Sequence, residues 1–124
     1  MKAKLSKTEK KVLCIKLAKY LPQIRSLLNV NQKEFGSICG ISTDRLSRIE
    51  NKHVVMTWSQ AIAVIAVANM NAVTKEFLYL KNIVPMKFYQ YIQGLDESIP
   101  PIMNVLIRDE VLNYTDNMKG KEDF

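Results

Sequence analysis

The sequence is poor in the residues on which most enzyme and metal sites depend. Its 124 residues include one His, two Cys, four Gly and four Pro. A single His with two Cys that lack CxxC spacing cannot supply a zinc ligand set, a disulfide framework or a Cys–His catalytic pair. Neither a GxGxxG nor a GKS/GKT phosphate loop is present. We therefore expect no enzyme activity, no cofactor and no metal site.

Long hydrophobic runs are also lacking. Lysines interrupt the first sixteen residues throughout, which excludes the apolar region of a signal peptide. The longest run without a charged residue, 54–74, contains Thr, Ser, Gln and Asn and is typical of a buried helix with flanking loops, not of a membrane span. Cys14 and Cys39 lie among apolar residues and resemble small buried hydrophobes in a reducing compartment. We expect a cytoplasmic protein that does not enter a membrane.

The scarcity of Gly and Pro disfavours a sheet of many strands, and apolar residues spaced by three or four predict an all-α fold. Ser6 with Glu9, and Thr57 with Gln60, have the spacing of helix capping boxes. Pro22 predicts a kink or a break near residues 20–21. The expected helices cover residues 7–29, 32–38, 43–50, 58–69 and 74–82, then a turn or two between Pro85 and Gly94, and a last helix over 100–114.

Charge is unevenly distributed along the chain. The net charge is +6, from 18 Lys and Arg and 12 Asp and Glu. Residues 1–25 carry +7, residues 54–99 are balanced, and residues 100–124 carry −2. A basic first part of the chain indicates a polyanionic partner, either nucleic acid or an anionic membrane surface. The alternative is a basic helix face that contacts only solvent.

The most informative segment is 32–51, with the sequence QKEFGSICGISTDRLSRIEN. Two helices joined by a three-residue turn need a small residue where they cross and a residue that accepts positive φ in the turn. Gly36 and Gly40 meet these requirements. Apolar residues flank the turn and line one side of the second helix: Phe35, Cys39, Ile41, Leu46 and Ile49. The pattern predicts a helix-turn-helix, whose second helix enters the major groove of DNA.

With these residues the chain resembles the phage-repressor/Cro (XRE) family of helix-turn-helix transcriptional regulators over about residues 17–80. The resemblance rests on Gln32, on Gly-Ile-Ser at 40–42, on Ile-Glu-Asn-Lys at 49–52, and on Arg25 seven residues before Gln32. It implies a lambda-repressor-like five-helix domain, here with an N-terminal helical extension and an extra C-terminal helix. Family members usually carry Ala at the position of Gly36. The resemblance also implies that Arg25 pairs with Glu50 and that both have structural roles.

Helix-turn-helix recognition and the resemblance together assign the DNA contacts. Base contacts are expected from residues whose side chains point away from the buried side of helix 42–50: Thr43, Asp44, Arg45 and Arg48. Arg can donate two hydrogen bonds to guanine, and Asp can accept one from cytosine. Phosphate contacts are expected from Gln32, Ser42, Ser47, Asn51 and Lys52. The alternatives are a helix-dipole role for Asp44 and surface ion pairs for the two arginines.

We expect three parts: a basic N-terminal arm or helix (1–16), a helix-turn-helix DNA-binding domain (17–82), and a C-terminal helical extension (83–124) that offers a surface for dimerisation or a protein partner. The arm would follow the phosphate backbone. The expected function is a sequence-specific, double-stranded-DNA-binding transcriptional regulator, a repressor that acts as a homodimer on a near-palindromic operator. It would be nucleoid-associated and of bacterial, phage or mobile-element origin. The alternative is an antitoxin or another protein-interaction module built on the same fold.

Overall fold

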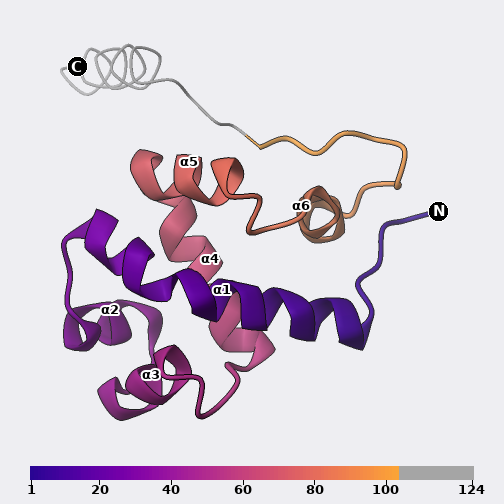
Figure 1. Cartoon of the computed structure of the whole chain (residues 1–124). Coiled ribbons are helices and arrows are strands. Elements are labelled where there is room, and N and C mark those ends of the chain that lie inside the picture. The colour runs from indigo at the N-terminus through magenta and orange to yellow at the C-terminus, as the bar shows by residue number, and fades with distance from the viewer. Residues whose placement is uncertain (104–124) are drawn as a thin grey trace, which may run out of the picture.

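The computed structural model describes residues 1–103, and over that range the chain is all-α, as the sequence predicts. Its helices are α1 (Lys7–Leu28), α2 (Gln32–Cys39), α3 (Thr43–Glu50), α4 (Trp58–Asn69), α5 (Ala72–Leu80) and α6 (Met86–Gln93). Figure 1 shows α1 across the front, α2 and α3 below it, α4 passing behind it, and α5 and α6 above it.

The sequence predicts a kink or a break near Pro22. The first helix is continuous through Pro22, so the helix does not break there. Pro22 is exposed, where water can bond the carbonyl that the missing amide leaves unpaired. On the opposite side Leu17, Leu21 and Ile24 are fully buried. Burying three such side chains stabilises the helix by roughly 5 kcal/mol or more, against roughly 3 kcal/mol lost to a proline inside a helix. The expected boundary between residues 16 and 17 therefore falls inside one helix.

Side-chain caps set the starts of the first five helices. The capping boxes predicted at Ser6 and Thr57 are confirmed, and Asn31 forms a third one with Glu34. Asn71 accepts hydrogen bonds from the amides of the first turn of α5, so that helix begins at Ala72, two residues before the predicted start.

The helix α4 occupies the centre of the molecule. It packs against α1, α2 and α5, and it buries Ala61, Val64, Ile65 and Ala68. The nearly uniform apolar composition of 61–68 predicts this position, because a helix that is apolar on all sides must be surrounded by other helices. The core continues through the fully buried Phe35 of α2 and Leu78 of α5.

The chain after α6 is not helical as far as it is described. Gly94 ends α6 at φ 67°, as predicted. The predicted helix start at Pro100 is wrong, since residues 100–103 are not helical. The side chain of Gln93 explains this, because it binds the backbone of Ile102 from both sides: Ile102 N donates to Oε1 over 2.9 Å, and Nε2 donates to Ile102 O over 2.6 Å. The remainder of the predicted helix over 100–114 lies outside the described residues.

The first three residues are paired with the segment that follows α6. Ala3 N donates to Leu95 O over 2.9 Å, Glu97 N donates to Met1 O over 3.0 Å, and the amino group of Met1 pairs with Asp96. The N-terminus therefore lies beside α6, away from α3 (Figure 1). Because they are paired in this way, residues 1–3 do not form a free arm that could follow a phosphate backbone next to α3.

Candidate nucleic-acid interface

The turn between α2 and α3 consists of Gly40, Ile41 and Ser42, and two glycines shape it. Gly40 lies in the left-handed region, at φ 74° and ψ 31°, and ends α2. Gly36 is buried against the backbone of this turn, where a Cβ would lie 2.3 Å from Ile41 O. The approach is thus closer than Ala would allow. Ser42 caps α3 by accepting from Arg45 N over 3.2 Å.

A partly buried ion pair ties α3 to α1. Arg25 donates from Nε and Nη2 to the two carboxylate oxygens of Glu50, each over 2.8 Å, and the side chains are 18% and 6% exposed. This is the pairing that the resemblance implies. The carboxylate raises the pKa of Arg25 further above its ordinary value, chiefly through these hydrogen bonds. A bidentate geometry of this kind restrains the end of α3 in position and in rotation.

The outward side of α3 carries three exposed polar residues. Leu46 and Ile49 are buried, whereas Thr43, Asp44 and Arg48 face solvent. Asp44 Oδ2 lies 3.3 Å from Arg48 Nε, with both side chains largely exposed. An exposed pair one turn apart stabilises by only about 0.3–0.5 kcal/mol. Both side chains can therefore leave it for another partner at small cost.

Arg45 is turned toward the protein. Its Nε donates to Gln60 Oε1 over 3.2 Å, and its Nη2 donates to Val55 O over 3.3 Å. The guanidinium therefore bridges α3 to the loop before α4 and to the first turn of that helix. The structure places Arg45 apart from the other three residues expected to contact bases, and it gives the side chain a positioning role that a sequence pattern does not reveal.

Of the residues expected to contact phosphate, Gln32 lies at the start of α2, and Asn51 and Lys52 follow α3, whereas Ser42 lies in the turn and Ser47 within α3. At the start of α2, Gln32 Nε2 donates to Glu50 Oε1 over 3.2 Å, so the side chain joins the Arg25–Glu50 pair. Asn31 Oδ1 accepts from the amide of Glu34 over 2.8 Å, and the amides that begin any α-helix have no partner within the helix.

At the other end of α3, Asn51 Nδ2 donates to Ser47 Oγ over 3.4 Å, and Lys52 is exposed. Lys52 has a left-handed backbone, with φ 63°. Its amide donates to Ile49 O over 3.1 Å, and His53 N donates to Arg48 O over 2.8 Å, which closes the end of the helix. Of the expected phosphate contacts, Asn51 and Lys52 are the exposed ones beyond α3, whereas Ser42 serves first as a cap.

Comparison with protein-family models, with curated proteins and with solved structures found no match to this chain. The described residues contain no group of three or more His, Cys, Asp or Glu placed to hold a metal ion. Within residues 1–103 no single helix is long and apolar enough to span a membrane, and α4 and α5 meet that criterion only as a pair bent by 117°.

Proposed function

We propose that this chain is a sequence-specific, double-stranded-DNA-binding transcriptional regulator of the helix-turn-helix type, with α3 as the helix that enters the major groove. One observation carries the proposal: α3 presents Thr43, Asp44 and Arg48 outward while the Arg25–Glu50 pair fixes its far end. Side chains on a helix held in this way are preorganised for a rigid, grooved partner. The lambda-repressor-like arrangement is part of the proposal.

The three outward side chains suit the edges of base pairs. Arg48 can donate two parallel hydrogen bonds to guanine, Asp44 can accept from the amino group of cytosine, and the methyl group of Thr43 can contact that of thymine. Each good contact of this kind discriminates against a wrong base by about 1–3 kcal/mol. On either side, the first amides of α2 and the side chains of Asn51 and Lys52 would bind phosphates and set the register.

The proposed regulator acts as a homodimer on a near-palindromic operator. Several large apolar side chains of α5 and α6 are more than half exposed, among them Tyr79 (56%), Leu80 (68%) and Met86 (54%). Exposed apolar residues that are close together mark association surfaces more often than chance. We place the dimer contact on this surface, and we assign repression as the activity and the bacterial cytoplasm as the compartment.

Salt titration of duplex binding tests the proposal. Full-length protein and a labelled duplex of about 20 base pairs should form a complex whose affinity falls linearly on a logarithmic salt scale, with a slope of about −0.9 for each phosphate neutralised. Fluorescence anisotropy of the labelled duplex measures the affinity at each salt concentration and hence the slope. Absence of binding to any duplex at low salt would contradict the proposal and would favour the protein-interaction module that the sequence leaves open.

A further inference from the structure

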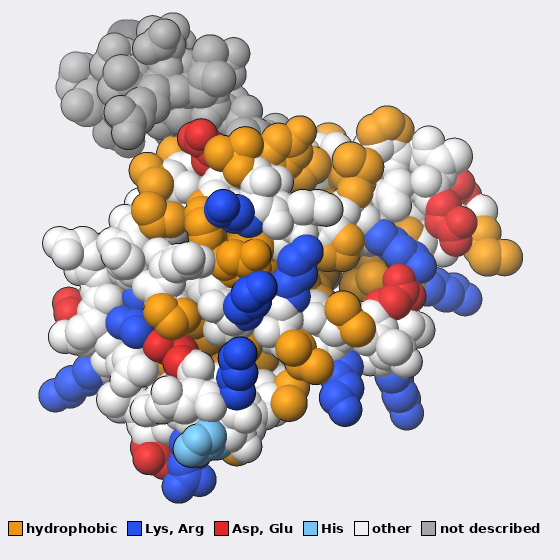
Figure 2. Space-filling model, viewed as in Figure 1, with side chains coloured by type: hydrophobic (Ala, Val, Ile, Leu, Met, Phe, Trp, Pro, Cys, Tyr) orange, Lys and Arg blue, Asp and Glu red, His pale blue; other side chains and the backbone are white. Residues whose placement is uncertain are grey.

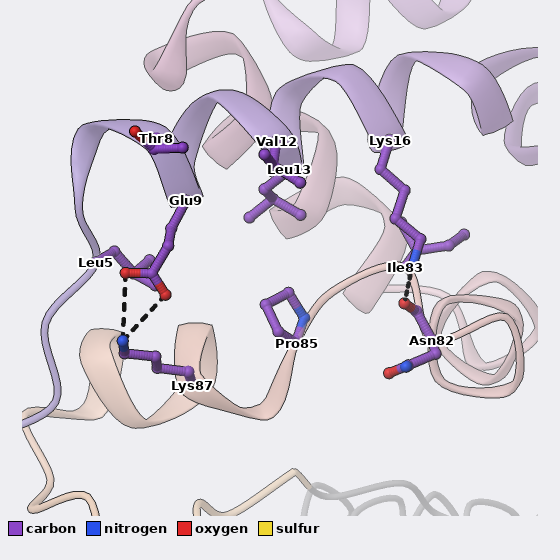
Figure 3. A pocket seen from close by; sticks show the side chains of 10 residues that line it. All are labelled: Leu5, Thr8, Glu9, Val12, Leu13, Lys16, Asn82, Ile83, Pro85 and Lys87. Carbon is purple, nitrogen blue, oxygen red and sulfur yellow. Dashed lines mark hydrogen bonds and ion pairs between the residues drawn. The ribbon is translucent and has the colours of Figure 1, made fainter.

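Two cavities lie on either side of α1, and they differ in whether the lysines that line them already have partners. The first lies between α1 and the connection from α5 to α6, with a volume of about 360 Å³. Figure 3 shows that its lysines are already engaged: Lys87 Nζ lies 3.0 Å and 3.2 Å from the carboxylate oxygens of Glu9, and Lys16 Nζ donates to Asn82 O over 2.6 Å. This cavity therefore offers little to an additional charged ligand.

The second cavity lies between α1, the end of α3 and the loop before α4, and we name it the α1–α3 groove. Its volume is about 350 Å³, within the range of about 300–1,000 Å³ that small-molecule sites have. Its lining consists of apolar residues and lysines, without an acidic side chain: Ile15, Lys16, Ala18, Lys19, Ile49, Lys52, Val54 and Val55. Figure 2 shows lysine and hydrophobic side chains alternating over the face that α1 crosses.

The cations available to a ligand in this groove are Lys19 and Lys52. The ammonium of Lys19 lies 5.5 Å from the centre of the Tyr20 ring, an exposed contact that is readily exchanged. Lys52 has no ion pair within residues 1–103. It also occupies a left-handed conformation, φ 63°, that Gly adopts at less cost. A lysine in this costly backbone conformation indicates that its side chain has a function at this position.

We propose that the α1–α3 groove binds an amphipathic anion of the acyl-carboxylate class. The acyl chain would cover Ile15 and Val55, which are 51% and 48% exposed, and the carboxylate would accept hydrogen bonds from Lys52 and Lys19. The volume suits one medium-length acyl chain and is too small for a partner helix about 10 Å across. Charge complementarity favours the anion, since the lining holds basic groups without a carboxylate.

The ligand would also weaken DNA binding, an inference that depends on the function proposed above. Lys52 is one of the expected phosphate contacts, and it lines the groove. One ammonium cannot hold a ligand carboxylate and a DNA phosphate with full strength at once. A ligand bound in the groove would therefore compete with the DNA phosphate that Lys52 is expected to contact beyond α3.

Calorimetric titration of the full chain with octanoate, without DNA, tests the site. Saturable binding is expected with octanoate and at least about 10-fold weaker binding with 1-octanol, which has the same chain length and no charge. Lys52→Gly should weaken octanoate binding by a similar factor while raising the melting temperature, because Gly relieves the left-handed backbone. Ile15→Asp should abolish binding, and Lys11→Met, on the same helix outside the groove, should leave it unchanged.

Equal affinity for octanoate and octanol, or octanoate binding that is the same in Lys52→Gly and the parent protein, would overturn the site. A second experiment separates the site from the link to DNA. Octanoate should lower duplex affinity of the parent protein and have a smaller effect on Lys52→Gly. Octanoate binding with unchanged duplex affinity would overturn the competition, and octanoate binding by a protein that binds no duplex would overturn the proposed function while supporting the site.

Discussion

Arg45 on α3 and Gln60 on α4 are joined by a hydrogen bond of 3.2 Å between Nε and Oε1. The same oxygen of Gln60 accepts from Thr57 N over 2.9 Å, within the capping box that starts α4. One arginine thus connects the α3 helix to the cap of the central helix. The side chain of its neighbour one turn along, Arg48, pairs with Asp44 and stays on the surface.

Replacing each arginine by Ala should separate positioning from base contact. Arg45→Ala should lower the free energy of unfolding by about 1 kcal/mol, since the hydrogen bonds to Gln60 and Val55 are lost, and should weaken binding to all duplexes alike. Arg48→Ala should change stability by less than about 0.5 kcal/mol and should remove preference among sequences while salt-sensitive binding remains. Urea denaturation and anisotropy measure the two effects. An equal loss of Arg48→Ala binding on every sequence would contradict base contact.

Removing one partner of the Arg25–Glu50 pair should lower the free energy of unfolding much more than removing both. Arg25→Met leaves the carboxylate of Glu50, 6% exposed, without its cationic partner and with only the hydrogen bond from Gln32 among those described. Stranding a buried charge costs about 3–5 kcal/mol, so the urea midpoint should fall sharply. The double variant Arg25→Met with Glu50→Leu should recover much of that loss, because neither charge remains buried. A double variant less stable than both single ones would show that the pair contributes through something other than charge compensation.

Gly36→Ala should destabilise the protein although Ala is the better helix former. The gain in helix propensity is at most about 1 kcal/mol. The added Cβ would lie 2.3 Å from the backbone oxygen of Ile41, so the turn must move. Overpacking of this kind costs about 1–3 kcal/mol. The control is Ser37→Ala, an exposed neighbour in the same helix, which should be neutral or slightly stabilising. If both variants raise the urea midpoint equally, the packing of Gly36 against the turn leaves room for a Cβ, which contradicts this account.

Local signals in the sequence were sufficient for most of the described helices. Apolar spacing located α1 to α4, and the capping residues Ser6 and Thr57 set two of their starts. The structure differs from the prediction where contacts distant in sequence decide: buried side chains such as Leu17 and Leu21 outweigh Pro22, and the Gln93 side chain bonds the backbone of Ile102 outside a helix. The inward turn of Arg45 has the same cause, since its acceptors lie 10 and 15 residues away and a helical pattern cannot reveal which way a long side chain points.

Cys39 should react slowly with alkylating reagents at neutral pH. Burial raises the pKa of its thiol from an ordinary 9.0 to about 11, so the reactive thiolate is about 100-fold scarcer at pH 8. In a Cys14→Ser background the alkylation rate should keep rising with pH up to about 11. Because the pKa is raised on folding, the stabilisation from the protonated thiol is present below pH 9 and is lost as the pH rises toward 11. Fast alkylation at pH 8 would contradict this environment.

The most direct measurement of the central claim, that the outward side of α3 contacts base edges, is selection of bound duplexes from a random pool by the full-length protein and by Arg48→Ala. The proposal predicts that the parent protein enriches an inverted repeat with half-sites spaced by about one helical turn, 10–10.5 base pairs, and that Arg48→Ala loses preference for a guanine at one position of each half-site. Enrichment of no sequence by the parent protein, or of the same sequence by both proteins, would contradict it.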